Sequence, residues 1–112
     1  MHREGVKLVG ELVPYLQGWQ HAGCAYGSEA LTVILARAGE YGMIVSYHTM
    51  PEWPEQTEVM IGSNTGVTFV AAHPGQKADY LLHVGRMKKF PILNLDISGT
   101  GLFRYGLLAA LA

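Results

Sequence analysis

The residues from Ser28 to Gly39 carry the strongest structural signal in this chain. Apolar side chains recur there at the i, i+3, i+4 and i+7 positions, which places them on one face of an α-helix: Leu31, Ile34, Leu35 and Ala38. Ser28 is suited to accept a hydrogen bond from the first helical turn, and Gly39 supplies the left-handed conformation that commonly ends a helix. We therefore predict a helix over 28–38 with one buried face.

The segments after this helix have the spacing of short β-strands. Residues 43–49 alternate their side chains between two faces, as a strand does. Residues 58–63 and 66–72 flank Asn64 and Thr65, which have turn character. This arrangement predicts a β-hairpin.

The rest of the second half is expected to contain one loop, one strand and two helices. Two prolines exclude a regular central strand over 50–56, so this segment is predicted to be a loop. Residues 76–87 have a helical pattern, and residues 90–97 are rich in Ile, Leu and Phe, as in a buried strand. A final helix, capped by Ser98 or Thr100, is expected to run to the C-terminus.

The N-terminal segment from Gly5 to Trp19 is compatible with two structures. Its apolar residues repeat at helical spacing, but Pro14 would remove a helix hydrogen bond. A kinked helix, or a short one that restarts at Pro14, fits best. A first strand over Val6 to Leu12 is the alternative.

These elements predict the fold class α+β, with a mixed, mainly antiparallel sheet of about four strands and helices packed mostly on one face. Strands joined by short turns must be antiparallel, whereas the strand over 90–97 arrives after a helical crossover. No linker or repeat interrupts the pattern. Because 112 residues is a common size for one domain, we expect a single α+β domain over residues 1–112.

The charge balance argues against nucleic acid as a partner. Eight Lys and Arg residues stand against nine Asp and Glu residues, whereas nucleic-acid binders usually show a basic excess. The N-terminus leads into no apolar run typical of a signal peptide, and the most apolar stretch, Leu102 to Ala112, is too short to span a membrane. A single cysteine, Cys24, favours a reducing compartment. We therefore expect a cytoplasmic protein that is not embedded in a membrane.

One enzymatic hypothesis starts from Cys24, which precedes the predicted helix over 28–38. The positive end of a helix dipole can lower the pKa of a thiol, and a nearby histidine can then act as base. His48 or His73 would be that base, and Asp96 would orient the imidazole. This arrangement predicts a small thiol-dependent hydrolase or transferase. The alternative for Cys24 is a small buried hydrophobic residue.

Two further patterns suggest ligands but have simpler structural explanations. Asp79 and His83 are four residues apart on a predicted helix, and His73 would add a third zinc ligand, but a solvated helical pair explains them more simply. The segment 95–101 resembles the strand, glycine-rich turn and helix N-terminus that bind phosphate. It lacks the full dinucleotide fingerprint, and a tight turn explains its glycines. We therefore expect no metal site and no cofactor.

The predicted C-terminal helix indicates self-association. Its apolar side chains surround most of the helix, and Arg104 is its one charged residue. One subunit would cover only one side of such a helix, and the exposed remainder would be larger than the apolar patches usual for monomers. We expect a homodimer through this helix, since two-fold association is the commonest closed assembly.

The sequence thus favours a non-enzymatic function, as a small homo-oligomeric binding or interaction protein with a ligand or partner cleft between the sheet and the helices. Trp53 lies between two prolines and two glutamates, where it would be a rigid aromatic anchor if exposed and a lid over the core if buried. Ligand or partner contacts are expected from Trp53, Tyr47, Trp19 and Arg104. The thiol-dependent enzyme, with Cys24 and His48 or His73, is the alternative function.

Overall fold

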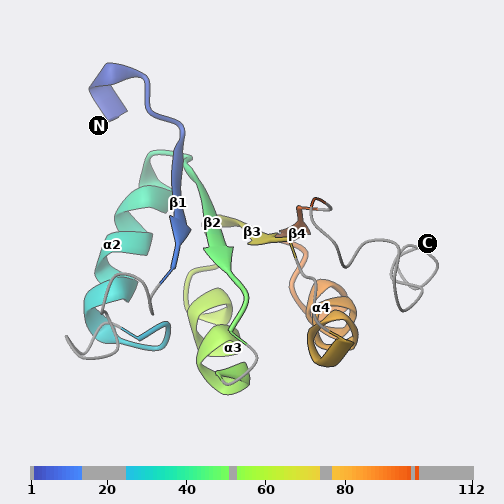
Figure 1. Cartoon of the computed structure of the whole chain (residues 1–112). Coiled ribbons are helices and arrows are strands. Elements are labelled where there is room, and N and C mark those ends of the chain that lie inside the picture. Colours follow the sequence, from blue (N-terminus) through green and yellow to red (C-terminus); the bar gives the residue numbers. More distant parts are fainter. Residues whose placement is uncertain (1, 14–24, 51–52, 74–76, 97, 99–112) are drawn as a thin grey trace.

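A computed structural model describes residues 2–13, 25–50, 53–73, 77–96 and 98, with the backbone alone described for residues 2 and 77–80. Within these residues, strands and helices alternate along the chain (Figure 1). The elements in chain order are η1 (His2–Glu4), β1 (Leu8–Leu12), α2 (Glu29–Glu40), β2 (Ile44–His48), α3 (Pro54–Gly62), β3 (Thr68–Ala72), α4 (Lys77–Lys89) and β4 (Leu93–Leu95). None of the helices in the described part of the chain is long and apolar enough to cross a membrane.

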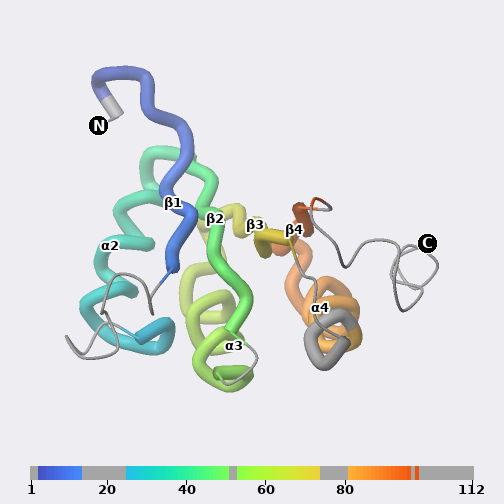
Figure 2. The backbone as a smooth tube through the Cα atoms, in the orientation of Figure 1, coloured from blue at the N-terminus to red at the C-terminus, as the bar shows by residue number. Residues whose placement is uncertain are grey.

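The four strands form one sheet in the order β1-β2-β3-β4, and all neighbouring strands are parallel. The number of strands agrees with the predicted sheet, but the prediction of a mainly antiparallel sheet is wrong. A helix lies between β2 and β3, in place of the first strand of the predicted hairpin. A helical connection returns the next strand parallel to the one before it, because the chain must cross back over the sheet. Figure 2 follows this path from each strand through a helix to the neighbouring strand.

Helix α3 replaces residues 54–56 of the predicted loop over 50–56 and nearly all of the first predicted hairpin strand over 58–63. Pro54 is the first helical residue, a position where its missing N–H is not needed. Three residues of α3 at the i, i+3 and i+4 spacing are buried: Thr57, Met60 and Ile61. This buried face stabilises the helix against the sheet and decides between helix and strand.

The first half of the chain agrees partly with the predictions. The alternative of a first strand is confirmed over Leu8–Leu12, and the preferred kinked helix is wrong for these residues. Helix α2 is confirmed, and the Ser28 hydroxyl accepts a hydrogen bond from the Leu31 backbone N–H at 3.3 Å. The predicted C-terminal position of Gly39 is wrong, because the helix continues to Glu40 and the nearest left-handed residue is Gly42, with φ +64°.

In the second half, the predicted helix over 76–87 and the predicted strand over 90–97 are confirmed as α4 and the shorter β4. Leu81 and Leu82 are exposed, whereas His83 and Arg86 are buried. The predicted C-terminal helix, and with it the predicted dimer contact, lies outside the described residues.

The buried core lies on the side of the sheet that the helices cover. When each strand pairs with the next one through right-handed crossovers, all helices lie on the same face. The side chains of β2 and β3 on this face are inaccessible to solvent: Val45, Tyr47, Phe69 and Ala71. Their neighbours Ile44 and Thr68, which pair with each other, point to the opposite face and are exposed. This opposite face is therefore exposed at Ile44 and Thr68, whereas Ala72, at the carboxyl end of β3 on the same face, is buried.

Candidate metal centre

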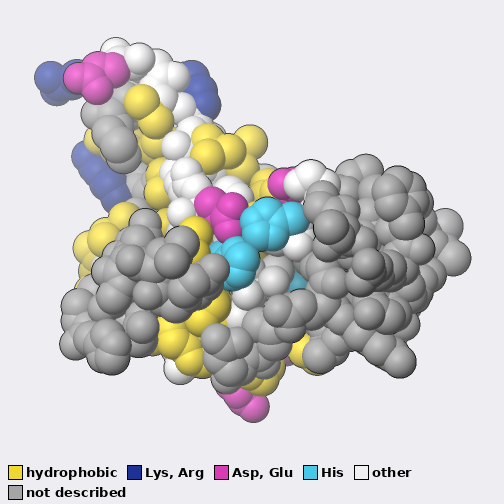
Figure 3. Space-filling model, viewed as in Figure 1, with side chains coloured by type: hydrophobic (Ala, Val, Ile, Leu, Met, Phe, Trp, Pro, Cys, Tyr) yellow, Lys and Arg dark blue, Asp and Glu magenta, His cyan; other side chains and the backbone are white. Residues whose placement is uncertain are grey.

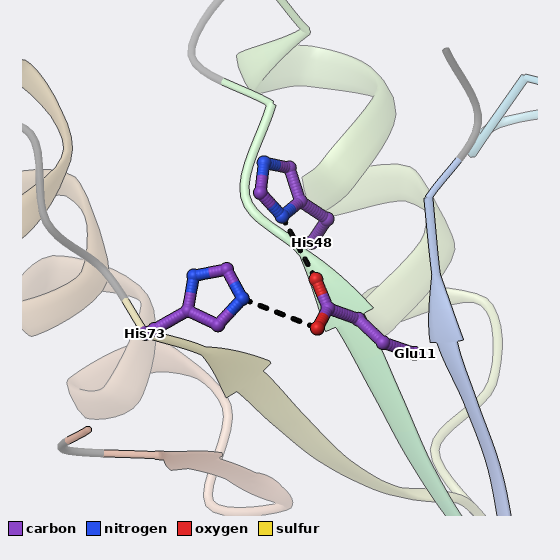
Figure 4. Close-up of side chains that lie close together, drawn as sticks. All are labelled: Glu11, His48 and His73. Carbon is purple, nitrogen blue, oxygen red and sulfur yellow. Dashed lines mark hydrogen bonds and ion pairs between the residues drawn. The ribbon is translucent and has the colours of Figure 1, made fainter. Parts of the chain in front are cut away.

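Three polar side chains meet at the carboxyl edge of the parallel sheet. Glu11 lies near the end of β1, His48 is the last residue of β2, and His73 directly follows β3 (Figure 4). In parallel α/β sheets the carboxyl ends of all strands lie at one edge, and ligands bind at that edge. The topology therefore brings together three residues that are far apart in the sequence.

A β-bulge in β1 directs Glu11 toward the two histidines. Val9 is paired with Val45 and Leu12 with Tyr47, so β1 contains one residue more than β2 over this interval. Leu12 is buried opposite Tyr47, while Glu11 is partly exposed and contacts His48. Bulges of this kind re-aim a side chain and are frequent beside active sites.

His73 has an uncommon backbone conformation for a residue other than glycine. Its φ is +33°, and it is the only such residue with a positive φ in the described part of the chain. Conformations of this kind cost about 1–3 kcal/mol and are concentrated at functional sites, where the surrounding structure maintains them. The conformation of His73, directly after β3, is therefore maintained at some cost in stability.

The two histidines bind opposite oxygens of the same carboxylate. His48 Nδ1 lies 2.8 Å from Glu11 Oε1, and His73 Nε2 lies 3.1 Å from Glu11 Oε2. The imidazole rings of the two histidines are 5.1 Å apart between centroids. All three side chains are between 26% and 37% exposed, so they are accessible to an ion or a small molecule. In the space-filling view, histidine and acidic side chains adjoin at the middle of the visible face (Figure 3).

The donor set of this cluster is suitable for a transition metal ion. One ligand atom from each of Glu11, His48 and His73 lies within 4.8 Å of the others. A tetrahedral zinc ion with bonds of about 2.0–2.2 Å keeps its ligand atoms roughly 3.3 Å apart, a separation that falls inside this 4.8 Å limit. Three protein ligands would leave the fourth position for water or substrate, as in catalytic rather than structural zinc sites.

Asp96 lies at the same edge, directly after β4. Its backbone N–H donates a hydrogen bond to the Ala71 carbonyl at 2.9 Å, which extends the pairing of β3 with β4. The Ser98 N–H donates to Asp96 Oδ1, also at 2.9 Å. Hydrogen bonds from the Ser98 backbone and side chain lower the pKa of the Asp96 carboxyl, and the charge of His73 lowers it further. Asp96 is therefore an ionised neighbour of the cluster at neutral pH.

Three of the residues expected at a catalytic site lie at this edge, although the structure pairs the histidines with Glu11. His48, His73 and Asp96 lie at one edge, as the thiol hypothesis requires, but Cys24 lies outside the described residues. Trp19 and Arg104 also lie outside them. The expected binding roles of these residues and of Cys24 stay predictions.

The two other expected contact residues are in or beside the core. Tyr47 is fully buried, with its ring 5.8 Å from that of Tyr26. Trp53 is partly buried against the core, and its ring lies 5.7 Å from the same tyrosine in an edge-to-face contact. Trp53 thus packs over one end of the core. Its role in partner binding stays a prediction.

The metal ligands considered from the sequence, Asp79, His83 and His73, are not brought together by the described residues. His83 is fully buried on α4, and the side chain of Asp79 is not described. His73 contacts Glu11 instead. Glu11 is not recognisable as a ligand from the sequence, because the helical spacing of the apolar residues around it favours a helix for its segment. Only a parallel sheet with a strand over this segment would place it beside the histidines.

Fold and site together define a parallel α/β protein with a candidate metal centre at the carboxyl edge of its sheet. Comparison with protein-family models, with curated proteins and with solved structures gave no match. Any functional assignment therefore depends on the geometry of the site itself.

Proposed function

We propose that this protein binds one divalent transition metal ion through Glu11, His48 and His73, and that it is a metal-dependent hydrolase. The observation that carries the proposal is the convergence of three donor atoms within 4.8 Å, from two strands and from the residue that directly follows a third. The expectation of a protein without metal is replaced by this proposal.

Stabilisation of the fold alone is a weaker explanation for the cluster. Exposed ion pairs contribute only about 0–1 kcal/mol, and the side chains concerned are roughly one-third exposed. Against this small gain stand a bulge that redirects Glu11 and an unfavourable backbone conformation at His73. These two local features are better explained by a requirement to keep the three donors together.

The ligand types favour zinc or a related ion over magnesium and calcium. Imidazole nitrogens suit Zn²⁺, Fe²⁺, Co²⁺ and Ni²⁺, whereas Mg²⁺ and Ca²⁺ prefer oxygen ligands. Two of the three donors here are imidazole nitrogens. At such a centre an ion lowers the pKa of bound water to near neutrality, which supplies a nucleophile for hydrolysis.

Zinc binding to the chain without a histidine tag tests the first half of this proposal. We expect isothermal titration to show one Zn²⁺ per chain, and Glu11→Gln or His48→Ala to weaken binding by at least about 100-fold. His73→Gly should weaken it equally while relieving the positive φ of this residue.

The matched control for the zinc titration is Glu55→Gln, which removes an exposed carboxylate in the first turn of α3. This variant should bind zinc as the unmodified chain does. Less than one ion per chain, or equal affinity in the control and in Glu11→Gln, would contradict the assignment.

A further inference from the structure

Asp96 occupies a position from which it can serve the proposed metal centre without being one of its ligands. Residue Ala71 pairs with Leu95, and the Asp96 N–H continues the ladder to the Ala71 carbonyl. Successive residues of a strand point to opposite faces, so Asp96 points to the face opposite to Leu95. This is the face of Asn94, which pairs with Val70, and not the face of the buried Leu93.

The same register places Asp96 in line with His48. His48 pairs with Ala72 across β2 and β3, and Asp96 follows Leu95, the partner of Ala71. His48, Ala72 and Asp96 thus form one row across three strands at the carboxyl edge. Neighbouring strands are about 4.8 Å apart, so the backbone of Asp96 lies about one strand spacing from Ala72, the residue before His73.

The surroundings of Asp96 favour the ionised form of its carboxylate and restrict its orientation. The Ser98 N–H holds Oδ1 at 2.9 Å, which restricts rotation of the group. The hydrogen bonds from Ser98 are the main cause that lowers the pKa of the Asp96 carboxyl, and His73 is a smaller cause in the same direction. An oriented carboxylate beside a metal centre, but outside its ligand set, is the arrangement of a proton acceptor.

We propose that Asp96 accepts the proton of the water held at the metal centre when this water attacks a carbonyl substrate such as a carboxylic ester or amide. This inference rests on the proposed metal binding. Asp96 takes a proton from the water as the water oxygen forms a bond to the substrate carbonyl carbon, and the carbonyl π electrons move to the carbonyl oxygen. When the carbonyl forms again, the bond to the leaving oxygen or nitrogen breaks, and Asp96 returns the proton to that atom. The products are a carboxylic acid and an alcohol or amine.

The position of Asp96 relative to the open coordination site can be measured without turnover. Azide binds Co²⁺ in place of water and changes the visible absorption of the Co²⁺-substituted protein. Removing a nearby negative charge favours an anion at the ion, so Asp96→Asn should bind azide roughly tenfold more tightly. The Asn side chain retains an oxygen for the Ser98 N–H, and Glu55→Gln serves as the control for loss of a remote charge.

Hydrolysis of p-nitrophenyl acetate by the Zn²⁺-loaded chain tests the chemical step. We expect Asp96→Asn to lower kcat by about 100-fold or more, with Zn²⁺ affinity changed less than threefold and partial rescue by Asp96→Glu. If the chain binds no Zn²⁺, the proposed function fails. If it binds Zn²⁺ but Asp96→Asn changes neither azide affinity nor kcat, or if the loaded chain hydrolyses no ester, the role of Asp96 is overturned while metal binding stands.

Discussion

Gly10 sets the position of Glu11, although it has no side chain of its own. Its φ is +119°, a conformation open to glycine, and a Cβ atom at this position would lie 2.2 Å from the Ser46 carbonyl oxygen. The close approach of Gly10 to β2 and the bulge that follows belong to the same local structure. A single glycine thus connects the pairing of two strands to the geometry of the site.

Substitution of Gly10 by alanine should therefore damage both stability and the site. We expect Gly10→Ala to lower the free energy of unfolding by about 2 kcal/mol or more, because the clash is with backbone that cannot move aside easily. Urea denaturation of the purified variant measures this loss. The control is Gly66→Ala, where a Cβ meets no atom within 4 Å, and its stability should change by less than about 1 kcal/mol. Equal stability of the two variants would show that the bulge is dispensable.

The sequence indicates part of the candidate site, but not Glu11, the residue that contacts both histidines. His48, His73 and Asp96 are recognisable as residues with chemistry that follow predicted strands. Glu11 is not, because its segment has a helical repeat of apolar residues and its glycine signals a bulge only when the strand is known. The bulge and the positive φ of His73 are tertiary features, so no local pattern reveals them.

At the scale of elements, one wrong assignment changed the predicted sheet. Residues 58–63 fit a strand by composition, but Thr57, Met60 and Ile61 also have helical spacing, and Pro54 is favourable at the first position of a helix. Short apolar segments are ambiguous between helix and strand, and burial decides between them. Once α3 is a helix, the parallel direction of β3 follows from the crossover rule.

Helix α4 allows a direct test of how much the helix propensity of a single residue contributes to the stability of the protein. Gly85 is exposed in its interior, and a Cβ there would meet no atom within 4 Å. Gly85→Ala should therefore raise the free energy of unfolding by about 1 kcal/mol, since alanine restricts the unfolded chain and favours the helix. Thermal and urea unfolding measure the gain. Leu81→Ala, at an exposed position of the same helix, should stay within about 0.5 kcal/mol; a loss of stability in Gly85→Ala would contradict the packing of α4.

At the scale of the whole molecule, polar side chains gather at two different places, the carboxyl edge of the parallel sheet and the buried side of α4. The candidate metal centre lies at the carboxyl edge and is accessible, whereas α4 buries His83 and Arg86. The Arg86 guanidinium donates a hydrogen bond to the Pro54 carbonyl at 3.3 Å and thereby links α4 to α3. Neither ring nitrogen of His83 has a hydrogen-bond partner among the described residues. Burial of a neutral, unpaired imidazole makes the stability of the fold dependent on pH.

Burial, together with the charge of Arg86, lowers the pKa of His83 from 6.5 to about 4. Between these values the unfolded chain binds a proton at His83 that the folded chain does not. The stability that depends on a neutral His83 is therefore fully present above about pH 6.5 and is lost as the pH falls toward 4. The loss amounts to roughly 2 kcal/mol between pH 7.5 and pH 5, from about 1.4 kcal/mol per pKa unit.

His83→Leu should remove this component of the pH dependence. Urea denaturation gives the free energy of unfolding of both proteins at pH 7.5 and at pH 5, and thus the loss of stability of each protein between these two pH values. The difference between the two losses is the contribution of His83, because the other titrating groups contribute equally to both proteins. We expect the unmodified chain to lose about 2 kcal/mol more than the variant, and the variant to be at least as stable at pH 7.5, because leucine leaves no buried nitrogen unpaired. Equal losses in the two proteins would mean that His83 is hydrated in the folded state, and the packing of α4 against the core would then have to be revised.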